Sequence, residues 1–395
     1  MSRAQKLAVA LLAVGQTLVY AGVYYAFPAI LPDLEAMTGW SKAALALGPS
    51  LSYLLMALLT PVTGRLVDRG LGGEMLIFLP VPAALAIALL GFVTDQAQWL
   101  ILWAVIGLAQ AGCLYETCFA FLTRRLGGGA RRAIVQVTLI AGFSGTLAFP
   151  FGHWMAHAFG AKGALIGYAC LMIFVAVPAN MFGVRILRAT TGPAEAAHPP
   201  PAPGRVRRAA AQPAFWALAA MMALVYLDHG ILLTYVLELF TSRGADAGMA
   251  TLAASAIGPC QVVGRLLLIM SEARMGNRRA TFAALCCLIG AAMALWGAGL
   301  TPMAIFLTAI CQGAGIGVMS ILRPVLIAEH LGRDGFGAIS GAIAVAPILA
   351  SAAAPMAGAW LLAAGGTVLV IAICAGLASG ALLIAWRLAP APSGR

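Results

Sequence analysis

Long apolar runs constrain this chain more than any other feature of its sequence. The run from Ile101 to Gly112, for example, contains no charged side chain and no alternation of polar and apolar residues. A helix needs about 20 apolar residues to cross the hydrocarbon core of a bilayer, whereas strands of a membrane barrel alternate polar and apolar side chains. The runs therefore predict membrane-spanning helices.

The overall composition agrees with this interpretation. The 395 residues are 62% hydrophobic and only 9% charged, while a soluble domain usually carries about 25% charged residues. We therefore predict an all-α membrane protein with twelve transmembrane helices. The predicted spans cover residues 7–31, 43–66, 75–93, 100–122, 133–157, 163–184, 215–239, 249–270, 280–298, 304–328, 336–363 and 367–386.

A polar stretch divides the chain into two halves of six spans each. Residues 185–214 contain Pro199-Pro200-Pro201 and five arginines, a composition typical of a flexible linker. We therefore predict an N-terminal six-helix bundle over 1–184, a cytoplasmic linker over 185–214 and a C-terminal six-helix bundle over 215–395. The halves also echo each other, since Gly48-Pro49 in the second span recurs as Gly258-Pro259 in the eighth.

The distribution of basic residues predicts the orientation. With the N-terminus inside, 19 of the 24 Lys and Arg residues lie in cytoplasmic segments, 3 lie in outer loops, and Arg265 and Arg323 lie within spans. Because Lys and Arg favour cytoplasmic loops, we expect both termini in the cytoplasm of a bacterial inner membrane. The net charge of +11 then reflects this loop bias, and we expect no nucleic-acid partner. The first run is too long for a cleavable signal peptide.

The segment Gly64-Arg65-Leu66-Val67-Asp68-Arg69-Gly70 resembles the loop-2/3 signature of the major facilitator superfamily. The resemblance implies a fold of two pseudo-symmetric six-helix bundles and a gating role for Gly64, Asp68 and Arg69. We expect Gly64 to allow close helix approach, and Asp68 to neutralise a helix end or an arginine. The sequence departs from the signature after Arg69, because Gly70 comes one position early.

A second cluster resembles the bacterial monocarboxylate and oxalate/formate branch of that superfamily. Gly39-Trp40-Ser41-Lys42-Ala43 opens the second span, and Gly264-Arg265-Leu266-Leu267 lies in the eighth. The resemblance implies that Arg265 binds a substrate carboxylate. Gln261 stands where an acidic residue is expected one turn before Arg265, and the eleventh span has no lysine.

Five ionisable residues lie deep within predicted spans: Glu116, Asp228, His229, Arg265 and Arg323. Such residues cost a few kcal/mol in a membrane and usually mark a function or a pair. Their charges cancel when His229 is neutral, so protonation of a carboxylate or of His229 would create a site for an anion. We hypothesise that Arg265 clamps the substrate and that Glu116 or the Asp228-His229 pair takes the proton.

Each assignment has a structural alternative. Arg265 could form an ion pair with Glu116, Arg323 could extend to the headgroups, and His229 could be a packing residue. Asp228 and His229 point about 100° apart on a helix, so we expect one of them to face the substrate path.

Further polar groups of the predicted spans extend the candidate substrate site. Tyr20 and Tyr24, one turn apart, are candidate substrate contacts or part of an interfacial aromatic belt. The remaining candidate substrate contacts are Gln110, Tyr115 and Gln312.

These features predict a secondary active transporter working by alternating access. The substrate expected first is a small organic anion such as a monocarboxylate, moved with protons or by exchange. The alternative is an exporter of drugs or metabolites driven by proton antiport. The sequence has no GxxxxGK[ST] motif and no recognisable catalytic motif, so we expect neither an ATP-driven pump nor an enzyme. We expect no cofactor and no metal site, and a monomer in the lipid bilayer.

Overall fold

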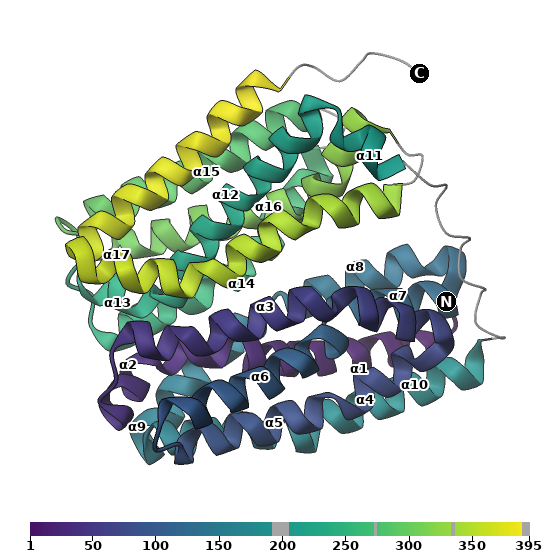
Figure 1. The fold of residues 1–395 in the computed structure, drawn as a ribbon, viewed down its shortest axis with the longest axis horizontal. Coiled ribbons are helices and arrows are strands. Elements are labelled where there is room, and N and C mark those ends of the chain that lie inside the picture. Colours follow the sequence, from purple (N-terminus) through teal and green to yellow (C-terminus); the bar gives the residue numbers. More distant parts are fainter. Residues whose placement is uncertain (192–204, 272–274, 333–335, 389–395) are drawn as a thin grey trace. The chain divides into compact units, whose positions relative to one another are not determined.

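The computed structural model describes residues 1–191, 205–271, 275–332 and 336–388, and every regular element among them is helical. The all-α class is therefore confirmed. The chain separates into two compact units, Met1–His198 (unit 1) and Pro199–Arg395 (unit 2), shown as ribbons in Figure 1. The predicted linker prolines and the side chain of Arg205 lie outside the described residues, as do Arg274, Arg333 and Arg395.

Unit 1 contains ten α-helices with short π and 3-10 segments between them in the described range 1–191. The helices are α1 (Arg3–Tyr20), α2 (Ala26–Thr38), α3 (Lys42–Leu66), α4 (Gly72–Phe78), α5 (Pro80–Leu89), α6 (Gln96–Cys113), α7 (Tyr115–Leu126), α8 (Ala130–Ala141), α9 (Ser144–Leu171) and α10 (Val177–Thr190). The π segments are η1 (Ala21–Tyr25), η2 (Val67–Leu71) and η5 (Met172–Ala176), and the 3-10 segments are η3 (Leu90–Phe92) and η4 (Gly127–Gly129).

Unit 2 contains seven α-helices within the described ranges 205–271, 275–332 and 336–388. They are α11 (Arg205–Ala210), α12 (Pro213–Thr234), α13 (Val236–Thr241), α14 (Ala247–Ser271), α15 (Asn277–Gly297), α16 (Ala304–Leu331) and α17 (Phe336–Arg387). The predicted linker is therefore partly helical at both ends: α10 continues through Thr190, and Arg205–Ala210 forms α11.

Eight helical stretches of the described residues are long and apolar enough to cross a membrane. Lys42–Phe92 spans 51 residues and Gln96–Thr190 spans 95. At about 1.5 Å per residue these stretches far exceed one crossing of a hydrocarbon core of about 30 Å. They are broken where sequence analysis placed loops, at Gly70 (φ 94°) and at Gly160 (φ 70°). The count of twelve spans itself stays a prediction.

Positive φ values explain why glycine stands at these breaks. Gly70 and Gly366 adopt φ values of 94° and 63°, a region that side chains with a Cβ rarely enter. Gly70 ends the helical path of α3 and η2 before α4, and Gly366 breaks the 52-residue α17 between the predicted eleventh and twelfth spans. The early Gly70 of the signature is therefore the residue that lets the chain turn.

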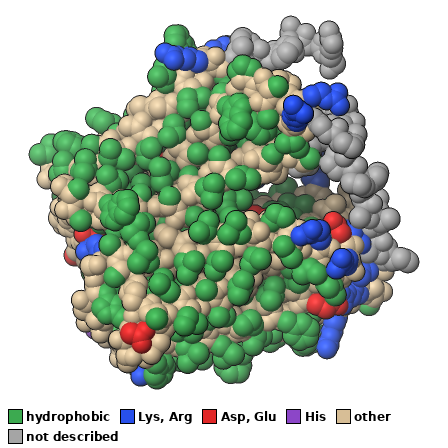
Figure 2. Space-filling view, viewed as in Figure 1, with side chains coloured by type: hydrophobic (Ala, Val, Ile, Leu, Met, Phe, Trp, Pro, Cys, Tyr) green, Lys and Arg blue, Asp and Glu red, His purple; other side chains and the backbone are tan. Residues whose placement is uncertain are grey.

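The surface of both units exposes more large apolar side chains than the surface of a water-soluble protein does. Exposed side chains include Phe78 at 65%, Ile101 at 63%, Phe174 at 73% and Trp360 at 66% of their area. Figure 2 shows hydrophobic side chains over most of the visible face, with Lys and Arg concentrated toward one end. Such extended apolar exposure marks a surface made for lipid. The chain is a multi-pass membrane protein.

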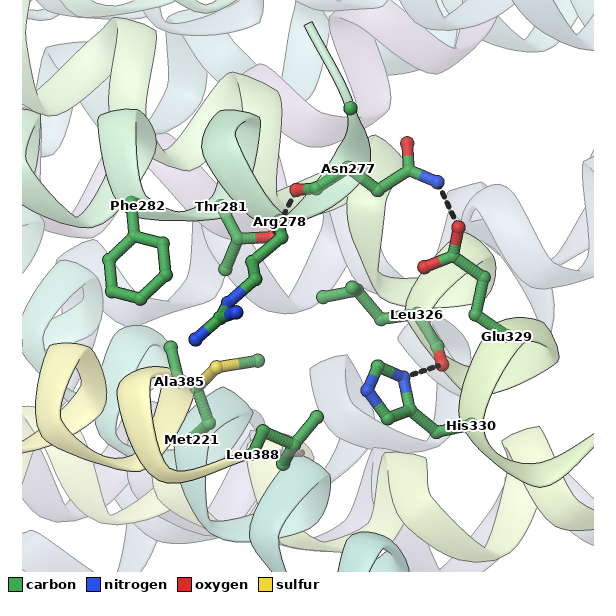
Figure 3. A pocket seen from close by; sticks show the side chains of 11 residues that line it. Met221, Asn277, Arg278, Thr281, Phe282, Leu326, Glu329, His330, Ala385 and Leu388 are labelled. Atoms are coloured by element: carbon green, nitrogen blue, oxygen red, sulfur yellow. Dashed lines mark hydrogen bonds between the residues drawn. The ribbon is translucent and has the colours of Figure 1, made fainter. Parts of the chain in front are cut away.

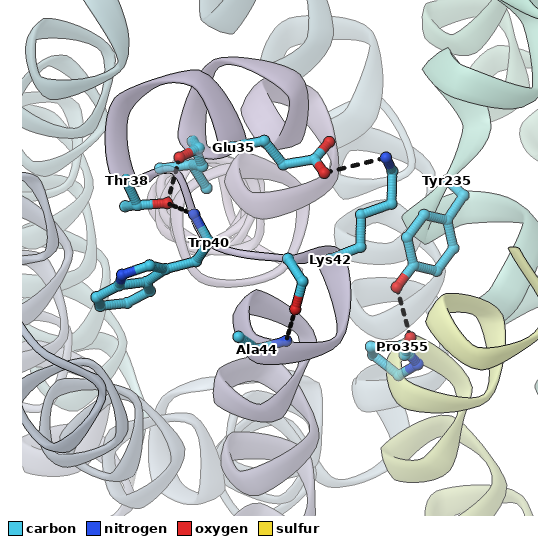
Figure 4. A network of polar contacts seen from close by, with 9 residues as sticks. Glu35, Thr38, Trp40, Lys42, Ala44, Tyr235 and Pro355 are labelled. Carbon is cyan, nitrogen blue, oxygen red and sulfur yellow. Dashed lines mark hydrogen bonds and ion pairs between the residues drawn. The ribbon is translucent and has the colours of Figure 1, made fainter. Parts of the chain in front are cut away.

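Hydrogen bonds at the helix ends fix the first outer connection and one helix break. Ser41 caps α3 by accepting a hydrogen bond from the Ala44 backbone N–H at 3.2 Å, and Lys42 pairs with Glu35 at 3.0 Å. In unit 2, the Tyr235 hydroxyl donates to the Pro355 carbonyl at 2.6 Å. Figure 4 shows these contacts. Tyr235 lies at the break between α12 and α13, so its bond ties that break to α17.

Small residues bring the long helices of each unit into direct backbone contact. A Cβ added to Gly107 of α6 would lie 2.6 Å from the Ser52 carbonyl oxygen of α3. In unit 2, Gly313 and Gly317 of α16 face the backbone of α14 at Ile257 and Gln261. Glycines four residues apart are a common device for close packing of membrane helices. The pairs α3–α6 and α14–α16 are thus equivalent close contacts in the two units.

We predict that Gly317→Ala destabilises the protein. Its Cβ would lie 2.4 Å from the Gln261 carbonyl oxygen and 2.8 Å from the Gln261 Cα, and overpacking of this kind costs about 1–3 kcal/mol. The measurement is the melting temperature of the purified protein in detergent. Gly376→Ala on α17 is the control, because its Cβ would meet nothing within 4 Å and helix propensity favours it. Equal melting temperatures for the two variants would contradict the packing argument.

Candidate functional site

A buried polar trio lies inside unit 2. Gln312 of α16 donates from Nε2 to Oδ2 of Asp228 at 3.0 Å, and the same nitrogen lies 3.4 Å from Nδ1 of His229. Asp228, His229 and Gln312 expose 1%, 7% and 0% of their area. Both neighbouring residues of α12 therefore reach one amide, whereas the helical wheel led us to expect that they diverge. Gln312 can contact both residues because its side chain comes from a different helix, α16.

Asp228 has a further hydrogen-bonding contact with the thiol of Cys374 on α17. In the described part of the chain, no Lys or Arg pairs with its carboxyl group. The Oε1 atom of Gln312 is buried and has no hydrogen-bond partner among the described residues. The site thus combines a carboxyl group without a cation and an amide oxygen with unused acceptor capacity, which suits a group that gains and loses a proton.

Unit 1 contains a matching glutamine with a different role. Gln110 of α6 accepts a hydrogen bond from Ser52 Oγ at 2.6 Å and donates to the Val23 carbonyl at 2.8 Å. Val23 belongs to the π segment η1, where the regular helical bonding pattern is interrupted. Because both ends of the Gln110 amide bond to protein groups, the side chain serves as a brace between α6, α3 and η1. Its predicted role as a substrate contact gains no support from this geometry.

The predicted tyrosines come together in unit 1. The ring centroids of Tyr20 and Tyr115 lie 4.4 Å apart, and those of Tyr20 and Tyr24 lie 6.1 Å apart. Tyr53 of α3 belongs to the same cluster, because its ring centroid lies 5.5 Å from that of Tyr24. The group is half-buried, and its members come from η1 and three helices, so it is a local cluster and not a belt around the unit.

Glu116 adjoins this tyrosine cluster. It lies in the first turn of α7, is exposed, and interacts electrostatically with Tyr20. A carboxylate beside a group of aromatic faces is an arrangement that can attract a cation. Glu116 therefore differs from Asp228, which is buried and held by an amide and a thiol.

The two intramembrane arginines stand apart from the trio of unit 2. Arg265 is half-buried on α14, next to Gly264, whose Cβ would lie 2.8 Å from the Ala314 backbone of α16. Arg323 is half-buried on α16 and precedes Pro324. The described contacts do not join either arginine to Asp228, His229 or Gln312. Substrate binding by Arg265 and Arg323 stays a prediction.

The residues of the predicted gating motif occupy three different environments. The exposed Asp68 lies 3.6 Å from the half-buried Arg124 of α7 in an ion pair, and Arg69 is exposed. A Cβ at Gly64 would meet nothing within 4 Å. Close helix approach at Gly64 therefore gains no support from the contacts within unit 1. Gating by Gly64, Asp68 and Arg69 stays a prediction.

A second ion pair at this end of unit 1 was not predicted. Arg188 of α10 donates from Nη2 to both carboxylate oxygens of Glu74 at 2.7 Å, which ties α4 to α10. Arg125 interacts electrostatically with both partners. Nothing in the sequence indicated this pair, because Glu74 and Arg188 lie 114 residues apart.

Metal binding gains no support from the residues that the structure describes, in which no three His, Cys, Asp or Glu side chains are grouped as ligands. Cys374, Ser52 and Tyr53 are the contributors to the polar and aromatic clusters that sequence reasoning missed. Nothing distinguishes these residues in the sequence, because each is a common residue type whose contact depends on the packing of distant helices.

Comparisons with known proteins identify the fold. The family model described as Major Facilitator Superfamily matches residues 12–350. The chain is similar in structure to a bacterial homologue of the human lysosomal transporter Spinster, with a TM-score of 0.66 and 15% sequence identity over 98% of this chain and 95% of that one. It is also similar to a point mutant of the nucleoside transporter NupG, with a TM-score of 0.72 and 10% identity over 97% and 98% of the two chains. A search of curated proteins found no match.

We predict that Gln312→Leu costs about 1–3 kcal/mol of stability, because Asp228 would be left buried without its amide donor. The double variant Gln312→Leu with Asp228→Leu should recover most of that loss, since removing both partners leaves no unpaired polar group. Thermal unfolding in detergent measures the double-mutant cycle. Gln110→Leu combined with Asp228→Leu is the control and should be additive within about 0.5 kcal/mol, because the Gln110 amide bonds to Ser52 and Val23 within unit 1. An additive Gln312–Asp228 cycle would contradict the coupling.

Proposed function

Because this chain belongs to the Major Facilitator Superfamily and is a transporter and not an enzyme, we propose that it carries out proton-coupled transport or exchange of a small organic anion by alternating access. The observation that carries the proposal is the buried Asp228, which has an amide and a thiol as partners and pairs with no Lys or Arg within the described residues. We further propose a bacterial inner membrane as its location, with both termini cytoplasmic, and a monomer as the working form.

The proton-coupling step follows from the cost of charge in a membrane. An ionised carboxyl group buried among helices is expensive without a cation, so Asp228 gains a proton at little cost to the fold. The amide of Gln312 can serve either protonation state of Asp228, because it offers both a donor and an acceptor. His229 shares this amide at 3.4 Å and is the second candidate in the same site.

Arg265 is the proposed anion ligand. Its planar guanidinium group stays charged and matches a carboxylate with two parallel hydrogen bonds. Protonation of Asp228 removes one negative charge from unit 2, so the arginines then attract an anion more strongly. Arg323 adds a second positive charge on α16. Proton binding thus favours substrate binding, and the two are released together.

A specific observation favours a second function. The half-buried tyrosine cluster with Glu116 beside it presents aromatic faces and a carboxylate, which together recognise organic cations. This arrangement supports the alternative of a proton-antiport exporter of cationic drugs or metabolites, in which Glu116 would bind the substrate. Arg265 and Arg323 argue against a cationic substrate, because their positive charges make the electrostatic potential of unit 2 more positive and repel cations.

Uptake of labelled anions tests the leading proposal. The full-length protein in proteoliposomes with an inward proton gradient should accumulate lactate, pyruvate, oxalate or formate, and Arg265→Lys should reduce the rate at least about tenfold because the two-pronged carboxylate contact is lost. The control is Arg132→Lys, which changes an exposed arginine of α8. Normal uptake by Arg265→Lys would refute its role, and gradient-driven movement of a cationic dye without anion uptake would favour the exporter.

A separate prediction concerns the proton. Asp228→Asn should abolish uptake driven by the proton gradient, because an amide cannot take the proton, while exchange of labelled for unlabelled substrate without a gradient should continue. The measurement is the ratio of gradient-driven uptake to exchange. Glu116→Gln is the comparison variant and should keep the wild-type ratio. The reverse pattern would move proton coupling to Glu116.

A further inference from the structure

A cavity of about 220 Å³ lies at one end of unit 2, away from Asp228. It forms where α15 begins and where α16 and α17 end, and Figure 3 shows the side chains that line it. Its floor is apolar and consists of Met221, Leu326, Ala385 and Leu388. Its polar lining includes Asn277, Arg278, Glu329 and His330. The cavity therefore offers both an oily surface and charged groups.

The two opposite charges of this cavity are held apart. The Arg278 guanidinium points toward Met221 and lies 5.7 Å from the centre of the Phe282 ring. Glu329 lies on the other side of the cavity, where Asn277 donates a hydrogen bond to its carboxylate. Among the described residues no ion pair joins Arg278 to Glu329. A cation and an anion separated by an empty space match a ligand that carries both charges.

Neighbouring residues place the cavity at the level of lipid headgroups. Trp386 adjoins the lining residue Ala385 and exposes 63% of its area, and Trp216 at the start of α12 also exposes 63%. Exposed tryptophans concentrate at membrane–water interfaces. Arg279 and Arg387 are exposed at the same end, as expected for the cytoplasmic side. Phospholipid headgroups are the zwitterions that are abundant at this depth.

We propose that this cavity binds the headgroup of a zwitterionic phospholipid that carries a free ammonium group. The phosphate binds Arg278, since a guanidinium group matches phosphate oxygens with paired hydrogen bonds. The ammonium group binds Glu329, whose carboxylate keeps acceptor sites beyond its bond to Asn277.

The cavity has room for a headgroup. Its volume of about 220 Å³ holds several water-sized groups, and its polar lining suits the phosphoethanolamine part of the lipid. The acyl chains therefore lie along the apolar surface outside, and Leu388 and Met221 contact the glycerol region. The proposal is independent of the transported substrate.

Native mass spectrometry of the full-length protein in detergent tests the site. The protein is titrated with ethanolamine, choline and glycerol phospholipids that have identical acyl chains. We expect ethanolamine lipid to be retained at least about fivefold more strongly than the other two, because only it offers an unblocked ammonium group to Glu329. Arg278→Gln should weaken retention of all three about tenfold through loss of a charge-assisted contact to phosphate.

Two further variants separate the charges from the cavity. Glu329→Gln should remove the preference for ethanolamine over glycerol lipid while retaining the glycerol lipid. Ala385→Phe should abolish selective retention by filling the cavity without changing any charge. Arg279→Gln removes an exposed charge next to Arg278 that does not line the cavity, and it should match the wild type. Ala385→Phe also keeps the test valid if Arg278→Gln fails to fold.

Several results would overturn the proposal. Equal retention of the three lipids by the wild type would show ordinary boundary lipid. Equal effects of Arg278→Gln and Arg279→Gln would show general attraction of basic residues to lipid. Displacement of the lipid by inorganic phosphate alone would show a simple anion site, because phosphate lacks both the ammonium group and the chains.

Discussion

The burial of one carboxyl group among membrane helices is the constraint on which the rest of unit 2 depends. Asp228 exposes 1% of its area and is satisfied by Gln312 and Cys374 from two other helices. Gln312 adjoins Gly313, which with Gly317 packs α16 against α14, and Cys374 lies on α17, which packs beside α12. The polar site therefore depends on the helix packing. If the helices moved apart, the carboxyl group would lose its hydrogen-bond partners in an apolar medium.

The two units use the same architectural position for different purposes. Gln110 of α6 and Gln312 of α16 both reach from a tightly packed helix to the first helical region of their unit. In unit 1 the partner is the Val23 carbonyl in a π segment, so the glutamine repairs an interrupted backbone. In unit 2 the partner is an ionisable carboxyl group. A glutamine that braces the backbone in one half thus corresponds to a glutamine that bonds a buried carboxyl group in the other, which fits divergence of two related halves.

Sequence alone predicted the helical class and several helix breaks, because the length of apolar runs is a local property. Gly70, Gly160 and Gly366 lie at breaks that the apolar runs had indicated. It could not predict the contact of Cys374 with Asp228 or of Glu74 with Arg188, since these depend on which helices pack together. The role of Gly64 was implied by the resemblance to the loop-2/3 signature, and the contacts within unit 1 do not support it.

The ion pairs of unit 1 and the buried carboxyl group of unit 2 differ in how much they stabilise the protein. The described ion pairs of unit 1 join Lys42 to Glu35, Arg124 to Asp68 and Arg188 to Glu74, and each lies near a helix end. Their side chains expose 18–62% of their area, so water screens these pairs and they add little stability. Such pairs can break and re-form at small cost during a conformational change. The carboxyl group of unit 2 has the opposite character, because every change in its protonation alters a buried charge. In the proposed mechanism the two kinds of site have different roles: the weak contacts permit movement, and the buried carboxyl group makes movement depend on a proton.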